Sequence, residues 1–158
     1  MAFPGKFLIS LVALATSTGC YIADWNETHI YNPTWPPHAK FHNGQTMSMG
    51  ALLGICTLWY LWAPIAMGAE TRAKDKIPLA ARRDAELERL RTAVLFGALY
   101  WVTQASAYVY PGTDAFDPIP GLDTRDRSAQ LKLDVVLLSM LSLGWWLEWR
   151  RIKWRRTD

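Results

Sequence analysis

Four stretches of the chain are free of charged residues and mostly apolar, and polar segments separate them. They run from Phe7 to Ala23, Phe41 to Ala69, Thr92 to Thr113 and Val135 to Leu147. A bilayer core about 30 Å thick needs about 20 helical residues. The second and third stretches meet this length outright, whereas the first and fourth are marginal and need neighbours, tilt or snorkelling ends. The pattern predicts four transmembrane helices.

The expected fold class is all-α, with a single membrane domain that spans residues 1–158 and packs four transmembrane helices into a bundle. The helices are expected at about 7–24, 44–67, 89–110 and 130–149. The connections are expected to be two luminal loops, 25–43 and 111–129, and one cytosolic loop, 68–88. A basic tail, 150–158, would follow the last helix.

Two of these helices have start signals outside their apolar stretches. Pro36 and Pro37 suit the first turn of a helix and Thr34 is a plausible cap, so the second helix can begin well before its apolar core. After Pro78, the segment 79–91 is rich in helix formers. The third helix is therefore expected to begin in the cytosol.

Basic residues divide unequally between the two sides of this arrangement. Of 17 Lys and Arg, 13 fall on one side, in the N terminus, the middle loop and the tail. The other side holds four, which are Lys40, Arg125, Arg127 and Lys132. By the positive-inside rule, both termini face the cytosol.

Composition supports contact with lipid and argues against nucleic acid. Apolar residues make up 51% of the chain, charged residues 20%, and there are nine Trp. Near the C terminus, tryptophans interleave with arginines as they do at membrane interfaces, at Trp145, Trp146, Trp149 and Trp154. The bilayer is thus an expected partner, further membrane proteins are possible partners, and no nucleic acid is expected.

Two further features bear on location. Asn26 begins an Asn-Glu-Thr acceptor sequon on the side assigned as non-cytosolic, which fits a luminal site of glycosylation in the endoplasmic reticulum. Cys20 and Cys56 fall in apolar stretches and are expected to be buried thiols. Residues 1–23 have the features of a signal peptide, but the apolar character continues beyond Gly19, which favours a retained first helix.

All three histidines lie in the stretch 24–45, which is the most unusual part of the sequence. If the second helix begins near Pro37, His38, His42, Gln45 and Met49 share one of its faces. The other three expected helices carry polar groups at the same level. These are Asp24 and Glu27 on the first helix, Tyr100, Gln104 and Tyr108 on the third, and Asp134 on the fourth. Since polar groups in hydrocarbon are costly, these are expected to converge on an interior pocket.

Such a pocket has the groups for acid and base catalysis on an apolar substrate. A buried carboxylic acid can donate a proton and a neighbouring imidazole can accept one, which suits isomerisation, hydration or cyclisation. The candidate catalytic residues are Asp24, Glu27, His38, His42 and Asp134. The candidate substrate-binding residues are Asn43, Gln45, Tyr100, Gln104 and Tyr108.

No cofactor is expected, and a metal site is a weaker alternative. His38 and His42 are spaced to share a metal ion with His29 or Glu27. However, Ala39 follows His38, where a helical zinc protease has its glutamate. Interfacial histidines that only cap loops are another alternative.

Residues 32–44, Asn-Pro-Thr-Trp-Pro-Pro-His-Ala-Lys-Phe-His-Asn-Gly, resemble a family of small, uncharacterised four-helix membrane proteins of fungi and bacteria. The resemblance covers mainly residues 24–50 and implies no established activity. More remotely, the size and four-helix plan look similar to the emopamil-binding and sterol-isomerase group. In that group, acidic and histidine side chains inside a bundle shift double bonds of sterols.

Two functions of different classes follow. The first is a membrane-embedded isomerase- or cyclase-type enzyme of lipid or secondary-metabolite biosynthesis, acting on a terpenoid, sterol or polyketide. The second is a non-enzymatic membrane protein, such as an accessory subunit, a ligand-binding protein or a scaffold. Phosphate-loop, dinucleotide-binding and Gly-x-Ser-x-Gly motifs are absent from the sequence, which argues against the enzymes that carry them.

Overall fold

The computed structural model describes residues 3–64, 78–116 and 126–154, and within these ranges it contains helices and no strand. The four long helices are α1 (Pro4–Asp24), α2 (Pro37–Trp62), α3 (Leu79–Ser106) and α4 (Ala129–Lys153). A short 3₁₀ helix, η2 (Ala107–Val109), extends α3. The prediction of an all-α chain with four helices is confirmed for this part of the protein.

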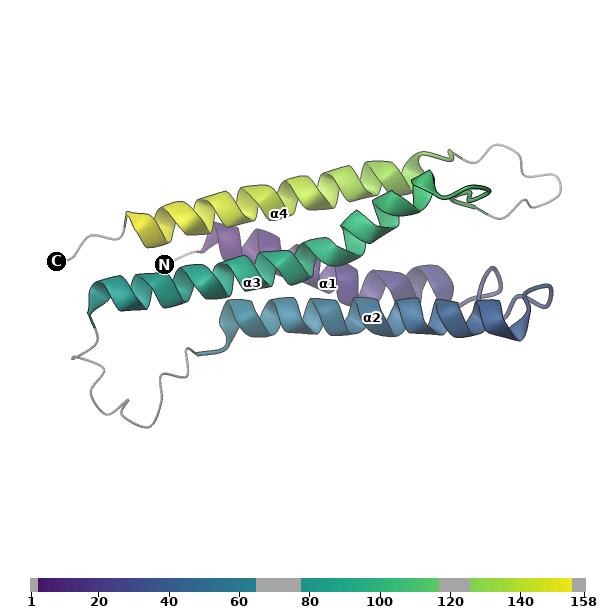
Figure 1. Ribbon diagram of the computed structural model, residues 1–158, viewed down its shortest axis with the longest axis horizontal. Coiled ribbons are helices and arrows are strands. Elements are labelled where there is room, and N and C mark those ends of the chain that lie inside the picture. The colour runs from purple at the N-terminus through teal and green to yellow at the C-terminus, as the bar shows by residue number, and fades with distance from the viewer. Residues whose placement is uncertain (1–2, 65–77, 117–125, 155–158) are drawn as a thin grey trace.

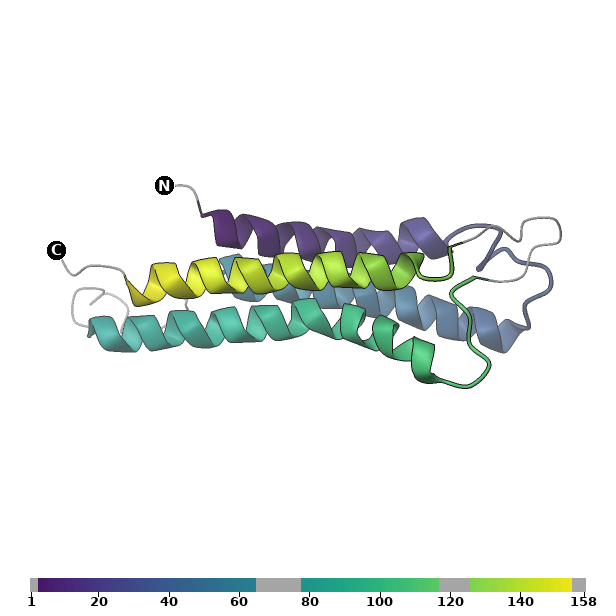
Figure 2. The ribbon, with the colours of Figure 1, turned by 90° about the horizontal axis from the view of Figure 1, so that it is seen from above.

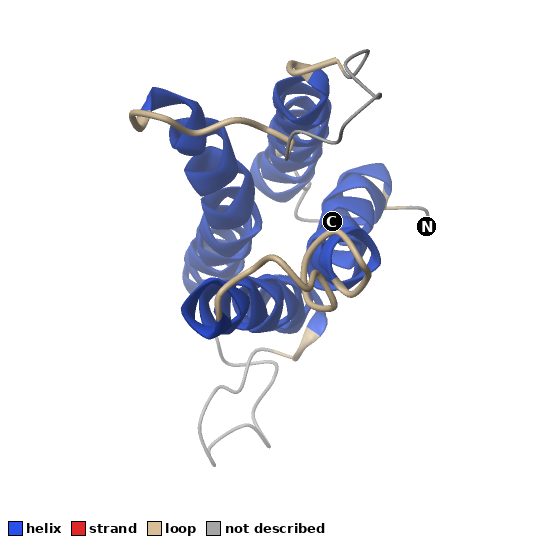
Figure 3. Ribbon diagram, turned by 90° about the vertical axis from the view of Figure 1, so that its right-hand side faces the viewer, coloured by secondary structure: helices blue, strands red, loops and turns tan. Residues whose placement is uncertain are grey.

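The helices form an antiparallel bundle in which each packs against two neighbours (Figures 1 and 2). Around the bundle the order is α1, α2, α3, α4 and back to α1, so α1 and α3 face each other across a diagonal. We call the end that holds Asp24, Pro37, Ser106 and Ala129 the loop end; Figure 3 looks onto it. The opposite end, where α1 starts and α4 finishes, is the basic end.

The boundaries of α2 follow from its prolines. The helix begins at Pro37, seven residues before the predicted 44, with Pro36 as its N-cap. Thr34 is not the cap, because its N–H and hydroxyl both donate to Asn32 Oδ1, over 2.9 and 2.7 Å. At the other end, Ala63 is extended with ψ of 141°, as the residue before Pro64 prefers, so α2 stops at Trp62. Residues 65–67 of the predicted helix lie outside the described residues.

At the basic end, α3 begins before its apolar stretch and α4 continues beyond its apolar stretch. As the sequence predicts, α3 begins directly after Pro78, and its charged first turns run through Arg91. The last turn of α4 carries Arg150, Arg151 and Lys153, whose charges suit a helix C terminus. The predicted basic tail is therefore helical as far as Lys153. The remainder of the tail and parts of loops 68–88 and 111–129 lie outside the described residues.

Within the described residues, two helices, α1 and α4, are long and apolar enough to cross a membrane. This reverses the expectation that the second and third stretches would be the strongest candidates. The reason is that freedom from charge differs from hydropathy. The first half of α2 is rich in Asn, Gln, Ser, Thr and Gly, and the first half of α3 is charged. The sequence-based prediction had used only the length of the uncharged runs and not their mean hydropathy.

Small residues set the contacts between neighbouring helices. An added Cβ at Gly54 of α2 would lie 2.4 Å from the Ala13 carbonyl oxygen of α1, and one at Gly5 would lie 2.5 Å from the Gly144 oxygen of α4. The backbones therefore touch, as small-xxx-small patterns allow. Between these contacts the core is apolar and includes Ile9, Val12, Leu90, Ala93, Leu137 and Leu141.

Candidate functional site

Asp134 is the most unusual polar group inside the bundle. It lies in the second turn of α4, near the loop end, and it is only 1% exposed. Among the residues that the structure describes, neither of its carboxylate oxygens has a hydrogen-bond partner. Burying an unpartnered polar group costs about 1–3 kcal/mol in mutational data. A folded chain retains such a group only where something outweighs that cost, and a functional role is the usual one.

Three other helices bring polar groups toward Asp134. Tyr100 of α3 is half-buried, and it lies close enough to Cys20, Asp24 and Asp134 to interact with all three electrostatically. Gly50 of α2 makes room for this arrangement, because a Cβ there would lie 2.8 Å from the Cys20 sulfur and 3.1 Å from Tyr100 Cε2. Tyr100 is therefore near the carboxylates of α1 and α4.

Asp24 is the last residue of α1 and is held by the start of α2. Its Oδ2 accepts a 2.8 Å hydrogen bond from Asn43 Nδ2, and its Oδ1 lies 3.9 Å from His29 Nε2. Asn43 is buried, and its own carbonyl oxygen has no partner within the described ranges. The two carboxylates thus differ, since Asp24 is hydrogen-bonded and Asp134 is not.

A layer of hydrogen-bonded side chains closes the site toward the middle of the bundle. Trp101 Nε1 donates to Thr16 Oγ1 over 2.9 Å, and Thr16 Oγ1 donates to the Val12 carbonyl over 2.8 Å. The Cys20 thiol donates to the Met47 carbonyl over 3.3 Å. Below this layer the core is mostly apolar, which separates these polar groups from the other end of the bundle. We call Asp24, Asn43, Tyr100 and Asp134 the interior acid site.

The structure separates His38 and His42 from the interior acid site, whereas His29 lies beside Asp24. His38, His42, Gln45 and Met49 do share a face of α2, but that face is exposed, whereas Asn43 and Met47 point inward. His38 and His42 contact each other, with 3.1 Å between their Nε2 atoms, and His42 Nδ1 lies 3.3 Å from Gln45 Oε1. The predicted single pocket is therefore divided into an outer histidine pair and an inner pair of carboxylates.

The remaining predicted residues lie at or beyond the helix ends. Glu27 is exposed in a turn after α1, because the helix stops at Asp24. Gln104 is half-buried near the end of α3. Tyr108 is in η2, and its hydroxyl donates to the Arg127 carbonyl over 2.9 Å, which ties η2 to the start of α4. Glu27 and Tyr108 thus do not join the interior acid site.

The sequon residue Asn26 has its side chain engaged in the turn after α1. Its Nδ2 donates to the Ala23 carbonyl over 2.6 Å, and its Oδ1 accepts from the N–H and hydroxyl of Thr28, over 2.8 and 2.6 Å. Glycosylation requires this amide nitrogen to be free. The turn would have to open before Asn26 is modified.

Asp126 organises the segment that leads into α4 and so helps to place Asp134. Its carboxylate accepts from Lys132 Nζ over 2.5 Å and from the Ser128 N–H over 3.0 Å. The hydrogen bond from Lys132, together with those from Ser128, lowers the pKa of Asp126 to about 2. Asp126 is therefore charged at neutral pH and, unlike Asp134, faces solvent.

The residues described do not form a metal site. No group of three or more His, Cys, Asp or Glu side chains among them is placed to hold an ion. His29, the third ligand considered with His38 and His42, instead lies beside Asp24 and against the Trp35 ring, with ring centroids 5.0 Å apart. The metal alternative thus has no support from this arrangement.

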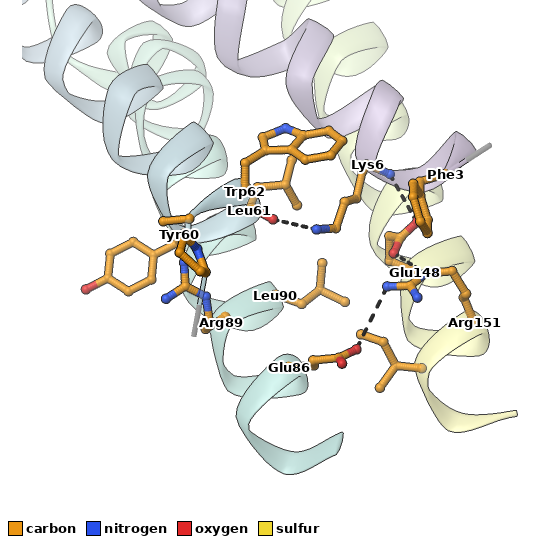
Figure 4. A pocket seen from close by; sticks show the side chains of 13 residues that line it. Phe3, Lys6, Tyr60, Leu61, Trp62, Glu86, Arg89, Leu90, Glu148 and Arg151 are labelled. Carbon is orange, nitrogen blue, oxygen red and sulfur yellow. Dashed lines mark hydrogen bonds and ion pairs between the residues drawn. The ribbon is translucent and has the colours of Figure 1, made fainter. Parts of the chain in front are cut away.

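Sequence reasoning missed a second polar cluster, at the basic end. Glu148 is 1% exposed, and its two oxygens accept from the Lys6 N–H over 3.2 Å and from Arg151 Nε over 2.7 Å. It lines a cavity with Lys6, Arg89 and Arg151 (Figure 4). A signal was present, since Glu148 is the one acidic residue between Asp134 and Asp158, and an arginine follows it at i+3.

Comparison with known proteins gives a family and no activity. No curated protein and no solved structure matches the chain. One family model, described as a family of unknown function, matches residues 8–157 and so covers the greater part of all four helices. The chain belongs to this family of unknown function, DUF6640.

Proposed function

We propose that the protein is a multi-pass membrane protein in which all four helices cross the bilayer and both termini are cytosolic. The outer surface supports this proposal. Large apolar side chains are exposed along the middle of every helix, where a soluble bundle would be polar, including Leu11, Leu14, Leu52, Ile55, Leu95, Leu99, Val136 and Leu143. The second halves of α2 and α3 can thus face lipid despite the lower mean hydropathy of these helices.

The charge distribution supports the orientation. Lys6, the basic first turns of α3 and the last turn of α4 gather at the basic end, which places that end in the cytosol under the positive-inside rule. The loop end then faces the opposite compartment. We propose the endoplasmic reticulum as the location, because the Asn26 sequon lies on the non-cytosolic side.

Within this framework, we infer that the interior acid site is the catalytic site of an enzyme that isomerises or cyclises an apolar substrate of lipid or secondary metabolism. The observation that carries the proposal is Asp134, a carboxyl group that is 1% exposed and has no hydrogen-bond partner among the described residues. An ionised carboxylate in such a place is costly, so burial favours the protonated form of Asp134, which can act as a general acid.

The second carboxylate completes the chemistry. Asp134 gives its proton to one carbon of a double bond, which leaves positive charge on the other carbon. Asp24, hydrogen-bonded to Asn43, accepts a proton from the next carbon beyond it, and the double bond moves by one position. Exchange with water returns a proton to Asp134 and removes one from Asp24, and no oxidant or reductant is consumed. Tyr100 is near both carboxylates, and its ring suits the stabilisation of positive charge on the substrate. His38 and His42 are outside this site and take no part in the step.

Comparative metabolite profiling tests the proposal. Hosts would carry the wild-type gene, its deletion, or one of the variants Asp134→Asn, Asp24→Asn, His38→Ala and Asp114→Asn. Asp114 is the matched control, because it is a carboxylate in the loop after η2 that pairs with Arg127 at 3.3 Å. We expect an apolar intermediate to accumulate in the deletion, Asp134→Asn and Asp24→Asn strains only. If both carboxylate variants behave as wild type at normal protein abundance, a partner-binding role is favoured instead.

A further inference from the structure

A cavity of about 330 Å³ opens at the basic end, so it lies at the opposite end of the bundle from the interior acid site. The last turn of α2, the early turns of α1 and α3 and the end of α4 form its walls (Figure 4). Three cations line it, and they come from three different helices: Lys6, Arg89 and Arg151. Aromatic and aliphatic side chains fill the wall between them, including Phe3, Tyr60, Trp62 and Leu90.

The two carboxylates in the wall are engaged with one of these cations. Arg151 donates from Nε to Glu148 Oε2 over 2.7 Å, and its Nη2 lies 3.9 Å from Glu86 Oε2. The other oxygen of Glu148 accepts the Lys6 backbone N–H and so caps the first turn of α1. The two acids thus outweigh Arg151 by one charge, and with Lys6 and Arg89 the wall carries a formal charge of +1.

Lys6 and Arg89 face the cavity without an ion-pair partner in the described part of the chain. Lys6 Nζ donates to the Leu61 carbonyl over 2.7 Å and stands 4.6 Å from the centroid of the Trp62 ring. Arg89 Nη2 donates to the Trp59 carbonyl over 2.9 Å. An ammonium group has three N–H donors and a guanidinium has five, so both keep donors for a ligand. The dipole of α2 offsets only about half a charge there, which leaves the site positive.

We propose that this cavity binds the phosphate group of an anionic phospholipid. Lys6 and Arg89 are its charged ligands, and they suit a phosphate because each offers several donors. A lipid is favoured over a soluble phosphate because exposed apolar side chains continue from the cavity onto the outer surface, among them Phe7, Trp59 and Trp62. Acyl chains can lie along that surface. This assignment rests on the proposed membrane orientation and is independent of the proposed catalysis.

Lipid retention by the purified protein tests the site. The full chain in mild detergent would be mixed with phosphatidylcholine or phosphatidic acid, and bound lipid would be counted by native mass spectrometry. Variants would be Lys6→Gln, Arg89→Gln and the double variant. Arg150→Gln is the matched control, because Arg150 stacks on Trp146 outside the cavity at the same end. We expect selective retention of phosphatidic acid, weakened about fivefold by each single change and about 25-fold by both.

Three results would overturn the assignment: equal retention by the double variant and the wild type, an equal loss in Arg150→Gln, or displacement of the lipid by inorganic phosphate at matching concentration. Lys6→Arg keeps the charge and should retain the lipid, so it tests the site even if Lys6→Gln does not fold. Asp134→Asn should bind lipid as the wild type does. Failure of the catalytic proposal and failure of this one are therefore separate outcomes.

Discussion

Trp101 of α3 donates a hydrogen bond to Thr16 of α1 over 2.9 Å, and both side chains are buried. These two helices lie on a diagonal of the bundle, so few other groups join them. The bond therefore fixes the width of the bundle directly beneath the interior acid site.

We predict that Thr16→Val, which leaves the Trp101 N–H buried without an acceptor, lowers the free energy of unfolding by about 1–3 kcal/mol. Trp101→Phe should have a cost of similar size. The double variant should be less destabilised than the sum of the two, with a coupling of about 1 kcal/mol. Denaturant unfolding in detergent measures all three; strictly additive effects would show that the bond contributes nothing.

The contact of Gly54 with α1 leads to a second prediction. Gly54→Ala would place a Cβ 2.4 Å from the Ala13 carbonyl oxygen and should force α1 and α2 apart, at a cost of about 1–3 kcal/mol. Gly44→Ala on the same helix is the matched control, because within the described residues its Cβ would have no neighbour inside 4 Å. It should be neutral or stabilising by up to about 1 kcal/mol. Thermal unfolding of both variants measures these changes. Equal losses of stability in the two variants would show that Gly54 is not a close contact between α1 and α2.

We predict that the Asp134 side chain lowers the free energy of unfolding of the protein although it is needed for activity. Replacing it by Leu removes an unpartnered buried acid, so Asp134→Leu should raise the free energy of unfolding by about 1–3 kcal/mol and abolish turnover. Asp24→Leu breaks the hydrogen bond with Asn43 and should destabilise the protein instead. If Asp134→Leu proves markedly destabilising, Asp134 is a structural group with a partner.

The orientation is open to a labelling test. In a variant without Cys20 and Cys56, single cysteines would be placed at Lys153 and at Asp114, at opposite ends of the bundle. A membrane-impermeant maleimide added to sealed vesicles with the cytosolic face outward should label Lys153→Cys at once. Asp114→Cys should react only after the membrane is opened. Labelling of both sites without permeabilisation would contradict the proposed spanning arrangement.

Much of the fold was predictable because prolines and charge-free runs are local features. Pro37 and Pro78 set the starts of α2 and α3, as the start signals indicated, whereas α2 ends at Trp62, before Pro64 and short of the predicted residue 67. The shared face of His38 and His42 was predictable in the same way from helical spacing. Which face points inward was not, since that depends on contacts such as Gly54 with Ala13, which turn Asn43 inward and the histidines outward.

The candidate site was predictable only in part for the same reason. Asp24, Tyr100 and Asp134 were expected to be near one another because three helices carry them to one end. Glu27 lies outside the group because α1 ends at Asp24, as the predicted helix 7–24 does, so the helical spacing that placed Glu27 beside Asp24 does not continue to residue 27. Glu148 was missed because, although Arg151 is a local partner, the Lys6 N–H comes within reach only when α1 packs against α4 through Gly5 and Gly144.

Solvent hydrogen exchange tests the central claim most directly. Membranes containing the wild-type protein or Asp134→Asn would be incubated in deuterated water with an apolar extract from the deletion strain, and the products analysed for carbon-bound deuterium. Our account predicts a product that gains one deuterium at carbon with the wild type and is not formed with Asp134→Asn. A product without deuterium, or equal labelling with both proteins, would contradict acid catalysis by Asp134.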